Sequence, residues 1–210
     1  MQIRVDPTRM ELLRLRKRIE LARRGHKLLQ EKLEGLIKEF MPLVEEYVML
    51  RDQLDRQTPR VLALFSTVAV EMGDENLRTA LGQTGFKGEV DLSEERRANV
   101  PVPVLNVHTE RSSLFYSLLS TPATFDRAVA QLDGLFSLIL RTAEKEEGVR
   151  RLAKEIERTR RRVNALEYIL IPGLLRARKF IQAKLDEDER ASRVRNMKVK
   201  ELLEKAAAKR

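Results

Sequence analysis

The chain has no cysteine and no tryptophan, and only 5% of its 210 residues are aromatic. Without cysteine there is no disulfide scaffold, no thiolate metal site and no cysteine nucleophile. The two histidines leave few further ligands for a metal ion. We therefore expect a protein with no cofactor and no metal site, and we do not expect a compact core built on aromatic side chains.

Long hydrophobic runs are missing as well. The longest mostly apolar stretches, residues 61–70 and 165–175, are about half as long as a membrane-spanning helix. Residues 1–10 contain no apolar run of the kind found in a signal peptide. We expect a cytoplasmic protein with no direct membrane insertion. Charge is abundant instead: 35% of the residues are charged and the net charge is +9, which favours a negatively charged partner.

A heptad-like pattern occupies the first third of the chain. Positions spaced alternately three and four residues apart are almost all apolar, which is typical of a long helix that packs along one seam of a coiled coil. The members of this seam are Leu12, Leu15, Ile19, Ala22, His26, Leu29, Leu33, Leu36, Phe40, Leu43, Tyr47, Leu50, Leu54, Gln57, Val61, Leu64 and Val68. We interpret the polar member His26 as a partly buried residue that fixes the register.

The beginning and the interruptions of this helix are also marked. Thr8 and Glu11 have the spacing of a capping box, so we expect the N-cap at Thr8. Pro42 and Pro59 each remove a backbone donor and crowd the preceding turn. We expect a bend at each proline, with Pro59 as the candidate point of a break.

A second seam follows in the last third of the chain. It consists of Val149, Leu152, Ile156, Thr159, Val163, Leu166, Leu170, Gly173, Ala177 and Phe180. Upstream, a frame that is one residue out of step contains Phe125, Val129, Leu132, Phe136, Ile139 and Ala143. We expect a skip between the two frames, between residues 143 and 149. Pro172 predicts a kink near Ile169, and Gly173 should soften the helix there.

The segment between the seams has a different composition. We interpret Gly73, Gly82, Gly85 and Gly88 as turn residues. The period shifts toward two around Val100, Val102, Val104 and Val107, which predicts an edge strand or short hairpin because prolines alternate with the valines. This segment should form a small head between the helices.

The predicted fold class is therefore all-α: a long antiparallel two-helix coiled coil, with a small head that contains a short β-hairpin between the helices. Residues 1–70 would form the N-terminal helix, 71–122 the head with a short helix and the β-hairpin, 123–192 the C-terminal helix and 193–210 a basic tail. In antiparallel pairing, residues 22–33 would lie opposite residues 156–170. The last twenty residues would extend beyond the N-terminus as a single helix.

Catalytic motifs are not recognisable in the sequence. The glycines around Lys87 lack the spacing of a phosphate-binding loop. Paired acids such as Glu45 and Glu46 are interpreted as solvated faces. A pair of helices offers grooves rather than water-excluded pockets. We therefore expect no catalytic residues and a protein that is not an enzyme.

Positive charge is concentrated in three blocks. Residues 14–27 contain seven basic side chains and one acid, residues 150–162 seven and two, and residues 193–210 seven and two. This asymmetry predicts contact with acidic surfaces, although a solvated face would give the same composition. Two other functions remain open at this point: a nucleic-acid-binding coiled-coil arm and a passive scaffold that dimerises through its seams.

Several segments are more specific than the general pattern. They are residues 7–12 (Pro-Thr-Arg-Met-Glu-Leu), 25–29 (Gly-His-Lys-Leu-Leu) and 159–167 (Thr-Arg-Arg-Arg-Val-Asn-Ala-Leu-Glu), followed by Ile171 and Pro172. Together they resemble the D subunits of the V/A-type rotary ATPases, and the resemblance extends over nearly the whole chain. It implies a central-stalk rotor protein that transmits torque between a nucleotide-binding ring and the membrane ion-translocating rotor, in ATP synthesis or ATP-driven ion pumping.

The resemblance also implies partners and contact residues. The partners would be the catalytic and non-catalytic ring subunits (A and B), the small F subunit of the stalk and the funnel-shaped C subunit, with no nucleic acid among them. The protein would be cytoplasmic and peripheral to the plasma membrane. A hairpin in the head, for which Val100 to Val107 are the candidates, would influence hydrolysis. The implied ring contacts are Arg23, Arg24, Lys27, Arg160, Arg161, Arg162, Arg176 and Arg178.

Overall fold

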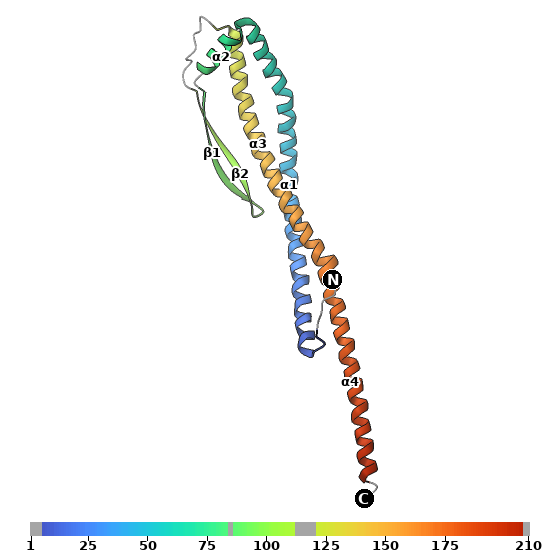
Figure 1. Cartoon of the computed structure of the whole chain (residues 1–210). Helices are drawn as coiled ribbons and strands as arrows, with labels where there is room; N and C mark the ends of the chain where they lie inside the picture. The colour runs from blue at the N-terminus through green and yellow to red at the C-terminus, as the bar shows by residue number, and fades with distance from the viewer. Residues whose placement is uncertain (1–5, 84–85, 112–120, 208–210) are drawn as a thin grey trace. The chain divides into compact units, whose positions relative to one another are not determined.

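The computed structural model describes residues 6–83, 86–111 and 121–207. In chain order, these residues form α1 (Arg9–Met72), α2 (Asp74–Gln83), β1 (Phe86–Arg97), β2 (Val100–Arg111), α3 (Ala123–Asn164), the π-helix η1 (Ala165–Leu170) and α4 (Ile171–Ala207) (Figure 1). The predicted fold class is confirmed, with long helices and one two-stranded antiparallel sheet. The chain divides into two compact units: unit 1 is residues 1–33 and 158–210, and unit 2 is residues 34–157.

Helix α1 has the predicted start. The backbone N–H of Glu11 donates to the Thr8 hydroxyl at 3.2 Å, and the N–H of Leu12 donates to the Thr8 carbonyl at 3.0 Å. The N-cap prediction is therefore confirmed. The helix ends before Gly73, whose φ of 81° turns the chain while its N–H donates to the Ala69 carbonyl at 2.9 Å. A left-handed glycine is a common stop signal because it lacks a Cβ.

The predicted break at Pro59 is wrong, because α1 continues through both Pro42 and Pro59. Both prolines are exposed, so water can satisfy the carbonyls that lose their helical donors. Leu43 and Val61, close to the two prolines, are buried at the seam. We attribute the continuity of the helix to this packing, which compensates for the proline cost of about 3 kcal/mol.

The core of unit 2 joins helices that are distant in sequence. One cluster contains Leu36, Leu43, Val100 and Leu152, and a second contains Val68, Ala80, Phe125 and Ala128. Residues in the middle of α1 therefore meet late residues of α3, and late residues of α1 meet early ones of α3. This order confirms the antiparallel pairing within unit 2. In the α1 seam, Gln57 is the only exposed member among the described residues.

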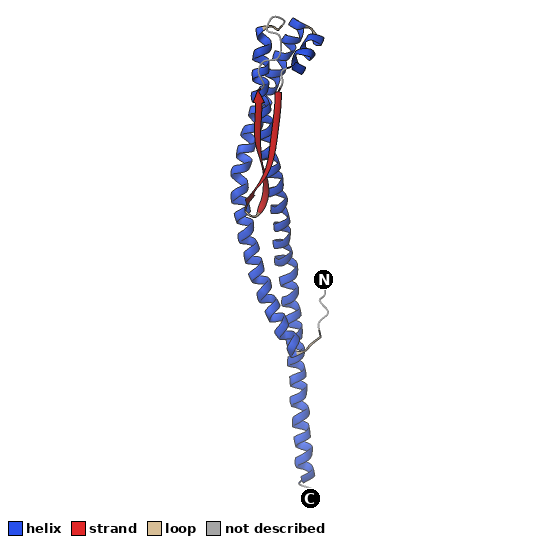
Figure 2. Ribbon diagram, turned by 90° about the vertical axis from the view of Figure 1, so that its left-hand side faces the viewer, coloured by secondary structure: helices blue, strands red, loops and turns tan. Residues whose placement is uncertain are grey.

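The hairpin extends further than predicted. β1 pairs with β2 from Phe86↔Arg111 to Arg97↔Val100, and Figure 2 shows both strands lying along the helices of unit 2. Ala98 and Asn99 form the two-residue turn, each with a positive φ (48° and 65°), as a type I′ turn requires. Val100 and Val102 are buried, as expected for the strand.

Sequence reasoning missed the whole of β1. The turn predicted at Gly88 is wrong because this residue lies within β1, and the turn predicted at Gly82 is wrong because that residue lies within α2. Gly85 is outside the described residues. The remaining turn prediction, at Gly73, is confirmed. Charged residues occupy much of β1, so its composition did not predict a strand. The apolar contacts of the hairpin are made mainly by the neighbouring strand, β2.

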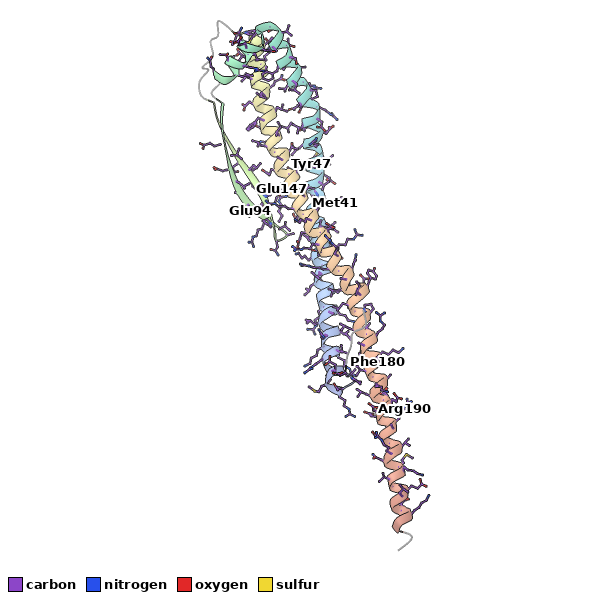
Figure 3. The ribbon with its side chains drawn as sticks, viewed as in Figure 1. Met41, Tyr47, Glu94, Glu147, Phe180 and Arg190 are labelled. Atoms are coloured by element: carbon purple, nitrogen blue, oxygen red, sulfur yellow. The ribbon has the colours of Figure 1, made fainter. Side chains whose placement is uncertain are left out.

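Polar side chains of α3 hold the hairpin against the helix. The Leu105 N–H donates to Glu144 Oε2 at 2.9 Å, and Arg151 donates to the Pro101 carbonyl at 3.0 Å and to Glu94 Oε1 at 3.2 Å. Glu94 and Glu147 are labelled on the facing elements in Figure 3. Because Arg151 also donates a hydrogen bond to Glu147, the pKa of Glu147 lies below its ordinary value of 4.5.

The predicted skip in α3 is wrong. Ala128, Leu135 and Thr142 are buried and Val149 is half-buried, and these four residues are spaced seven apart. One frame therefore continues through the region where two were expected. Thr142 is compatible with burial because its hydroxyl donates to the Leu138 carbonyl at 2.7 Å, which satisfies the donor within the helix.

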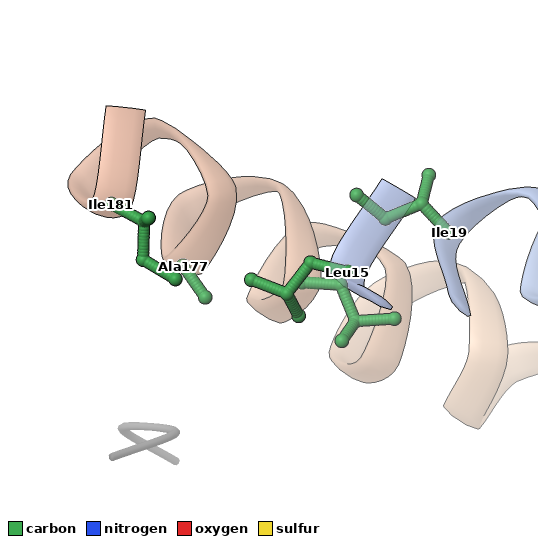
Figure 4. Packing of buried hydrophobic residues seen from close by; sticks show 5 residues of the cluster. Leu15, Ile19, Ala177 and Ile181 are labelled. Atoms are coloured by element: carbon green, nitrogen blue, oxygen red, sulfur yellow. The ribbon is translucent and has the colours of Figure 1, made fainter. Parts of the chain in front are cut away.

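Unit 1 contains its own antiparallel seam. Leu15 and Ile19 of α1 pack with Leu174, Ala177 and Ile181 of α4 in one buried cluster (Figure 4). Half-buried residues extend this cluster in both directions, with Leu12, Ala22, Leu175 and Leu185 packed against it. Residues 191–200 of α4, in the stretch predicted to extend as a single helix, are helical and all exposed.

The second seam changes frame at η1. The prediction that Phe180 lies in the seam is wrong, since it is 60% exposed, whereas its neighbour Ile181 is fully buried. A π-helical turn closes its hydrogen bonds over five residues rather than four, so it accommodates one extra residue and rotates the later part of the helix. Pro172 is the second residue of α4, in the turn that follows η1, and it provides a reason for the position of η1, since it cannot donate to a carbonyl in the preceding turn.

Candidate functional site

The two units carry opposite net charges. Unit 1 contains 26 Lys and Arg against 11 Asp and Glu, a net charge of +15. Unit 2 contains 15 against 21, a net charge of −6. Helices α1 and α4 each contribute to the positive charge of unit 1. The candidate site is therefore the outer surface of the helices in this unit.

The predicted contact residues all belong to unit 1. Their positions are Arg23, Arg24 and Lys27 on α1, Arg160, Arg161 and Arg162 at the end of α3, and Arg176 and Arg178 on α4. All are exposed except Arg178, which is half-buried. Arg24 forms an ion pair with Glu20, and the Lys27 ammonium lies 3.9 Å from Glu31. These intrahelical pairs are weak at exposed sites and leave the cations accessible to a partner.

The three consecutive arginines are displayed by the seam beneath them. Thr159 and Val163, which flank them, are buried. Because residues four apart lie on the same face of a helix, burial of this pair directs the three intervening side chains outward. Thr159 is only 1% exposed, and its hydroxyl has no hydrogen-bond partner within the described part of the chain. The seam thus retains a polar group at this position at a cost in stability.

The π-helix η1 brings a further pair of residues together. His26 Nε2 lies 3.4 Å from Glu167 Oε2, so the register residue predicted from the sequence meets an acid of η1. On the surface of unit 1, Leu21 and Leu28 of α1 and Tyr168 and Ile169 of η1 are exposed. Sequence reasoning missed these apolar side chains as surface groups. The sequence signal that could have identified them is that, after Leu166, apolar residues occur in two different helical frames.

The remaining features offer little chemistry in the described residues. No cluster of three or more His, Asp or Glu side chains that could hold a metal is present there. A groove of about 360 Å³ in unit 2 is lined by Gln57, Arg60, Val61, Gln131 and Gly134, and its lining contains no acid–base pair. None of the described helices combines the length and apolar character that crossing a bilayer requires.

Comparison with known proteins gives a consistent result over nearly the whole chain. The family model for the ATP synthase D subunit matches residues 11–201. The D subunit of the V-type ATP synthase of Acetivibrio thermocellus is 41% identical over 205 residues, covering 96% of this chain and 92% of the relative. The D subunit of the A-type ATP synthase of Methanopyrus kandleri is 40% identical over 207 residues, covering 98% and 89%. That of Pyrococcus horikoshii is 40% identical over 206 residues, covering 96% of each.

Proposed function

Because the chain belongs to the family of ATP synthase D subunits, we propose that it is the central-stalk rotor protein of a V/A-type rotary ATPase. It transmits torque between the nucleotide-binding ring and the ion-translocating rotor of the membrane, in ATP synthesis or ATP-driven ion pumping. It is a non-catalytic part of the complex. The nucleotide chemistry takes place in the ring.

The observation that carries this proposal is the concentration of positive charge on the surface of unit 1, outside its buried apolar cluster. A rotor needs an internal packing that does not depend on its partners and an outer surface that can exchange partners. The buried cluster around Leu15 and Ile181 supports the first requirement. Exposed cations support the second, because exposed ion pairs are each worth about 1 kcal/mol or less and can be released as the rotor turns.

The partners follow from this assignment. The basic surface of unit 1 faces the ring subunits (A and B), with Arg160, Arg161 and Arg162 as principal contacts and Arg23, Arg24, Lys27, Arg176 and Arg178 beside them. The F subunit binds along the stalk, and the C subunit joins it to the membrane rotor. The protein is cytoplasmic and peripheral to the plasma membrane. Because these contacts are not symmetric around the axis of the rotor, each orientation of the rotor favours a different conformation at each surrounding site of the ring. This is a population shift by differential binding.

The proposal is tested by replacing Arg160, Arg161 and Arg162 together by alanine in the reconstituted complex. We expect ATP-driven rotation to fall severalfold, because the ring loses charge-assisted contacts. The free energy of unfolding of the isolated chain should change by less than about 1 kcal/mol, since the three side chains are exposed. Rotation is measured on single complexes and stability by thermal unfolding.

The matched control is the triple alanine variant of Arg51, Arg56 and Arg60, which removes the same charge from exposed positions in unit 2. It should leave rotation near the wild-type rate. An equal loss in both variants would refute the specific role of the unit 1 arginines. Tight, strongly salt-dependent binding of random duplex DNA by the purified chain would instead favour the nucleic-acid-binding arm.

A further inference from the structure

Beyond Leu166, the seam of the C-terminal helix can continue in two frames. Spacings of four and three residues from Leu166 define the earlier frame, which consists of Leu170, Gly173, Ala177, Phe180 and Lys184. The later frame lies one residue further along and consists of Glu167, Ile171, Leu174, Arg178, Ile181 and Leu185. The structure uses the later frame: apart from Glu167 its members are buried or half-buried, whereas Phe180 and Lys184 of the earlier frame are exposed.

The change between the frames takes place in η1. The Ile171 N–H donates to the Leu166 carbonyl, five residues earlier, so the turn holds one residue more than an α-helical turn. If η1 closed as an α-helix, the following part of α4 would rotate by about 100° about its own axis, because each residue of an α-helix advances by that angle. Leu170 and Phe180 would then take the places of Ile171 and Ile181 at the seam.

Pro172 does not by itself impose the π turn. Two other prolines, Pro42 and Pro59, lie inside α1, and this helix passes through both of them as an α-helix. The same backbone conformation is therefore open to the residues around Pro172. The position of η1 reflects the packing of the seam as well as the proline.

Each register has its own packing advantage. In the observed register, Leu174 and Leu185 belong to or pack against the buried cluster of unit 1, where closing η1 would place Gly173 and Lys184. Closing η1 would instead bury Phe180, which is labelled on α4 in Figure 3 and is 60% exposed, and would replace a rare π turn by an α-helical one. An element with two discrete arrangements of this kind can act as a switch.

A polar contact selects the observed register. His26 Nε2 of the α1 seam lies 3.4 Å from Oε2 of Glu167, which is the first member of the later frame. In the other register, the apolar Leu166 and Leu170 would face this part of α1. His26 Nε2 is buried and has no hydrogen-bond partner within the described residues, so loss of the nearby carboxylate would be costly. Polar residues in an apolar seam commonly fix its register in this way.

We propose that η1 is a register switch within unit 1. Closing of η1 into an α-helix rotates α4 by about 100° and exchanges Ile181 for Phe180 at the seam, and the His26–Glu167 contact holds the π register. The exposed residues 191–200 rotate with the helix, so a partner that prefers one side of them selects one register. The switch uses residues of unit 1 alone and does not depend on the rotor assignment.

The test uses the full chain with para-fluorophenylalanine in place of Phe180, because this probe has nearly the size of the native side chain. Fluorine NMR separates an exposed ring from a buried one, since a soluble paramagnetic agent broadens the exposed signal. The wild-type chain should give a dominant exposed signal and a buried signal of about 10% or less, as expected for a minor state. The ratio of buried to exposed signal measures the two registers.

H26L should shift this ratio toward the buried signal. A leucine at this position packs well against Leu166 and Leu170 and poorly against the carboxylate of Glu167. We therefore expect the ratio to rise about tenfold. In H26L/E167L the later frame is apolar as well, and the ratio should return to near the wild-type value.

A second pair of variants leaves both η1 and His26 unchanged. K184L adds an apolar side chain to the earlier frame at an exposed position, so the ratio should again rise about tenfold. K179L makes the same substitution at an exposed position that belongs to neither frame, and it should leave the ratio unchanged.

Deletion of Tyr168 provides a control that disables the switch. Tyr168 is an exposed residue of η1, and without it an uninterrupted α-helix places the later frame at the seam. In this background, H26L and K184L should leave the fluorine signal exposed. Circular dichroism checks that each variant retains its helical content.

Two results would overturn the proposal. The first is an unchanged ratio in both H26L and K184L. The second is a rise of the same size after deletion of Tyr168, because the ring would then be buried by a change that does not involve η1. Both results concern the isolated chain and not torque, so the rotor proposal would stand.

Discussion

At the level of single residues, Gly148 explains why the hairpin can lie so close to the helix. It is buried in α3, and a Cβ built at this position would be 2.9 Å from Val102 Cγ1 and 3.2 Å from Leu43 Cδ2. No side chain fits at the first distance without displacement. Gly148 is therefore required for the close approach of β2 to the helices of unit 2, whereas Gly134 of the same helix has open space around it.

We predict that G148A and G134A change stability in opposite directions. Alanine is favoured over glycine in a helix by about 1 kcal/mol, so G134A should stabilise the protein by up to that amount. In G148A the same gain is offset by an overpacking cost of about 1–3 kcal/mol. Chemical denaturation of both variants measures the difference. Equal stabilisation by the two substitutions would mean that the hairpin does not pack on α3 as described.

Residue-level rules predicted some of these features and not others. The capping box at Thr8 was readable because its geometry is local. The frame of α3 was not, because Ile139 is more apolar than Thr142, yet Thr142 is buried and Ile139 is 43% exposed. A hydroxyl bonded to its own helix can enter a seam at low cost, and this possibility is invisible to a count of apolar residues.

At the level of elements, the hairpin is held by a charged cluster on α3. Arg151 contacts both Glu94 of β1 and Glu147 of α3, and it also binds the Pro101 carbonyl. The hydrogen bond from Arg151 is the largest cause of the lowered pKa of Glu147, and Arg150 lowers it further. A carboxyl group whose pKa is lower in the folded state stabilises that state above its unfolded pKa, and this contribution disappears as the pH falls.

We therefore predict that the hairpin loosens at acid pH. The contribution of Glu147 should be complete above its ordinary pKa of 4.5 and should be lost as the pH falls below that value through the lowered pKa. Amide hydrogen exchange of β2 is the measurement. E147Q should show weaker protection at neutral pH and a smaller change on acidification, whereas the exposed neighbour in E146Q should behave like wild type. A pH response of E147Q identical to wild type would contradict this role.

Which elements were predictable depended on where their contacts lie. The long helices and β2 were predicted because their own residues form the apolar seam or the buried face. β1 was missed because it is exposed along residues 89–96 and is specified by pairing with β2. The frame change at η1 was missed because a π-turn accommodates one extra residue without altering the composition of the helix. The basic site was predicted as a composition, and its contacts with partners remain a prediction.

At the level of the whole molecule, charge is separated in a way that the net value conceals. The total of +9 is the sum of a unit at +15 and a unit at −6, and the first unit is assembled from both ends of the sequence. Folding back of the chain therefore concentrates charge that is spread over distant blocks. The basic surface of unit 1 is suited to acidic partner surfaces.

A cross-link between α1 and α4 tests whether unit 1 acts as one rigid body. Arg9 and Glu189 form a 2.7 Å ion pair between α1 and α4, both side chains are exposed, and the chain has no native cysteine. In R9C/E189C, a short bismaleimide should therefore join the two positions within one chain. We predict that the linked protein still supports more than about half of the wild-type ATP-driven rotation, because torque passes through a seam that does not need to open.

The matched control is R9C/K205C, in which the second cysteine lies about 24 Å further along α4 and should not react within the chain. Gel mobility separates internal links from links between chains. A product of twice the mass as the only adduct of R9C/E189C would support the dimeric scaffold instead. If the internal link forms and rotation stops, while the unlinked double variant rotates normally, the two helices must move apart during each turn. The function would then lie in separation of the helices and not in transmission of torque through a rigid pair.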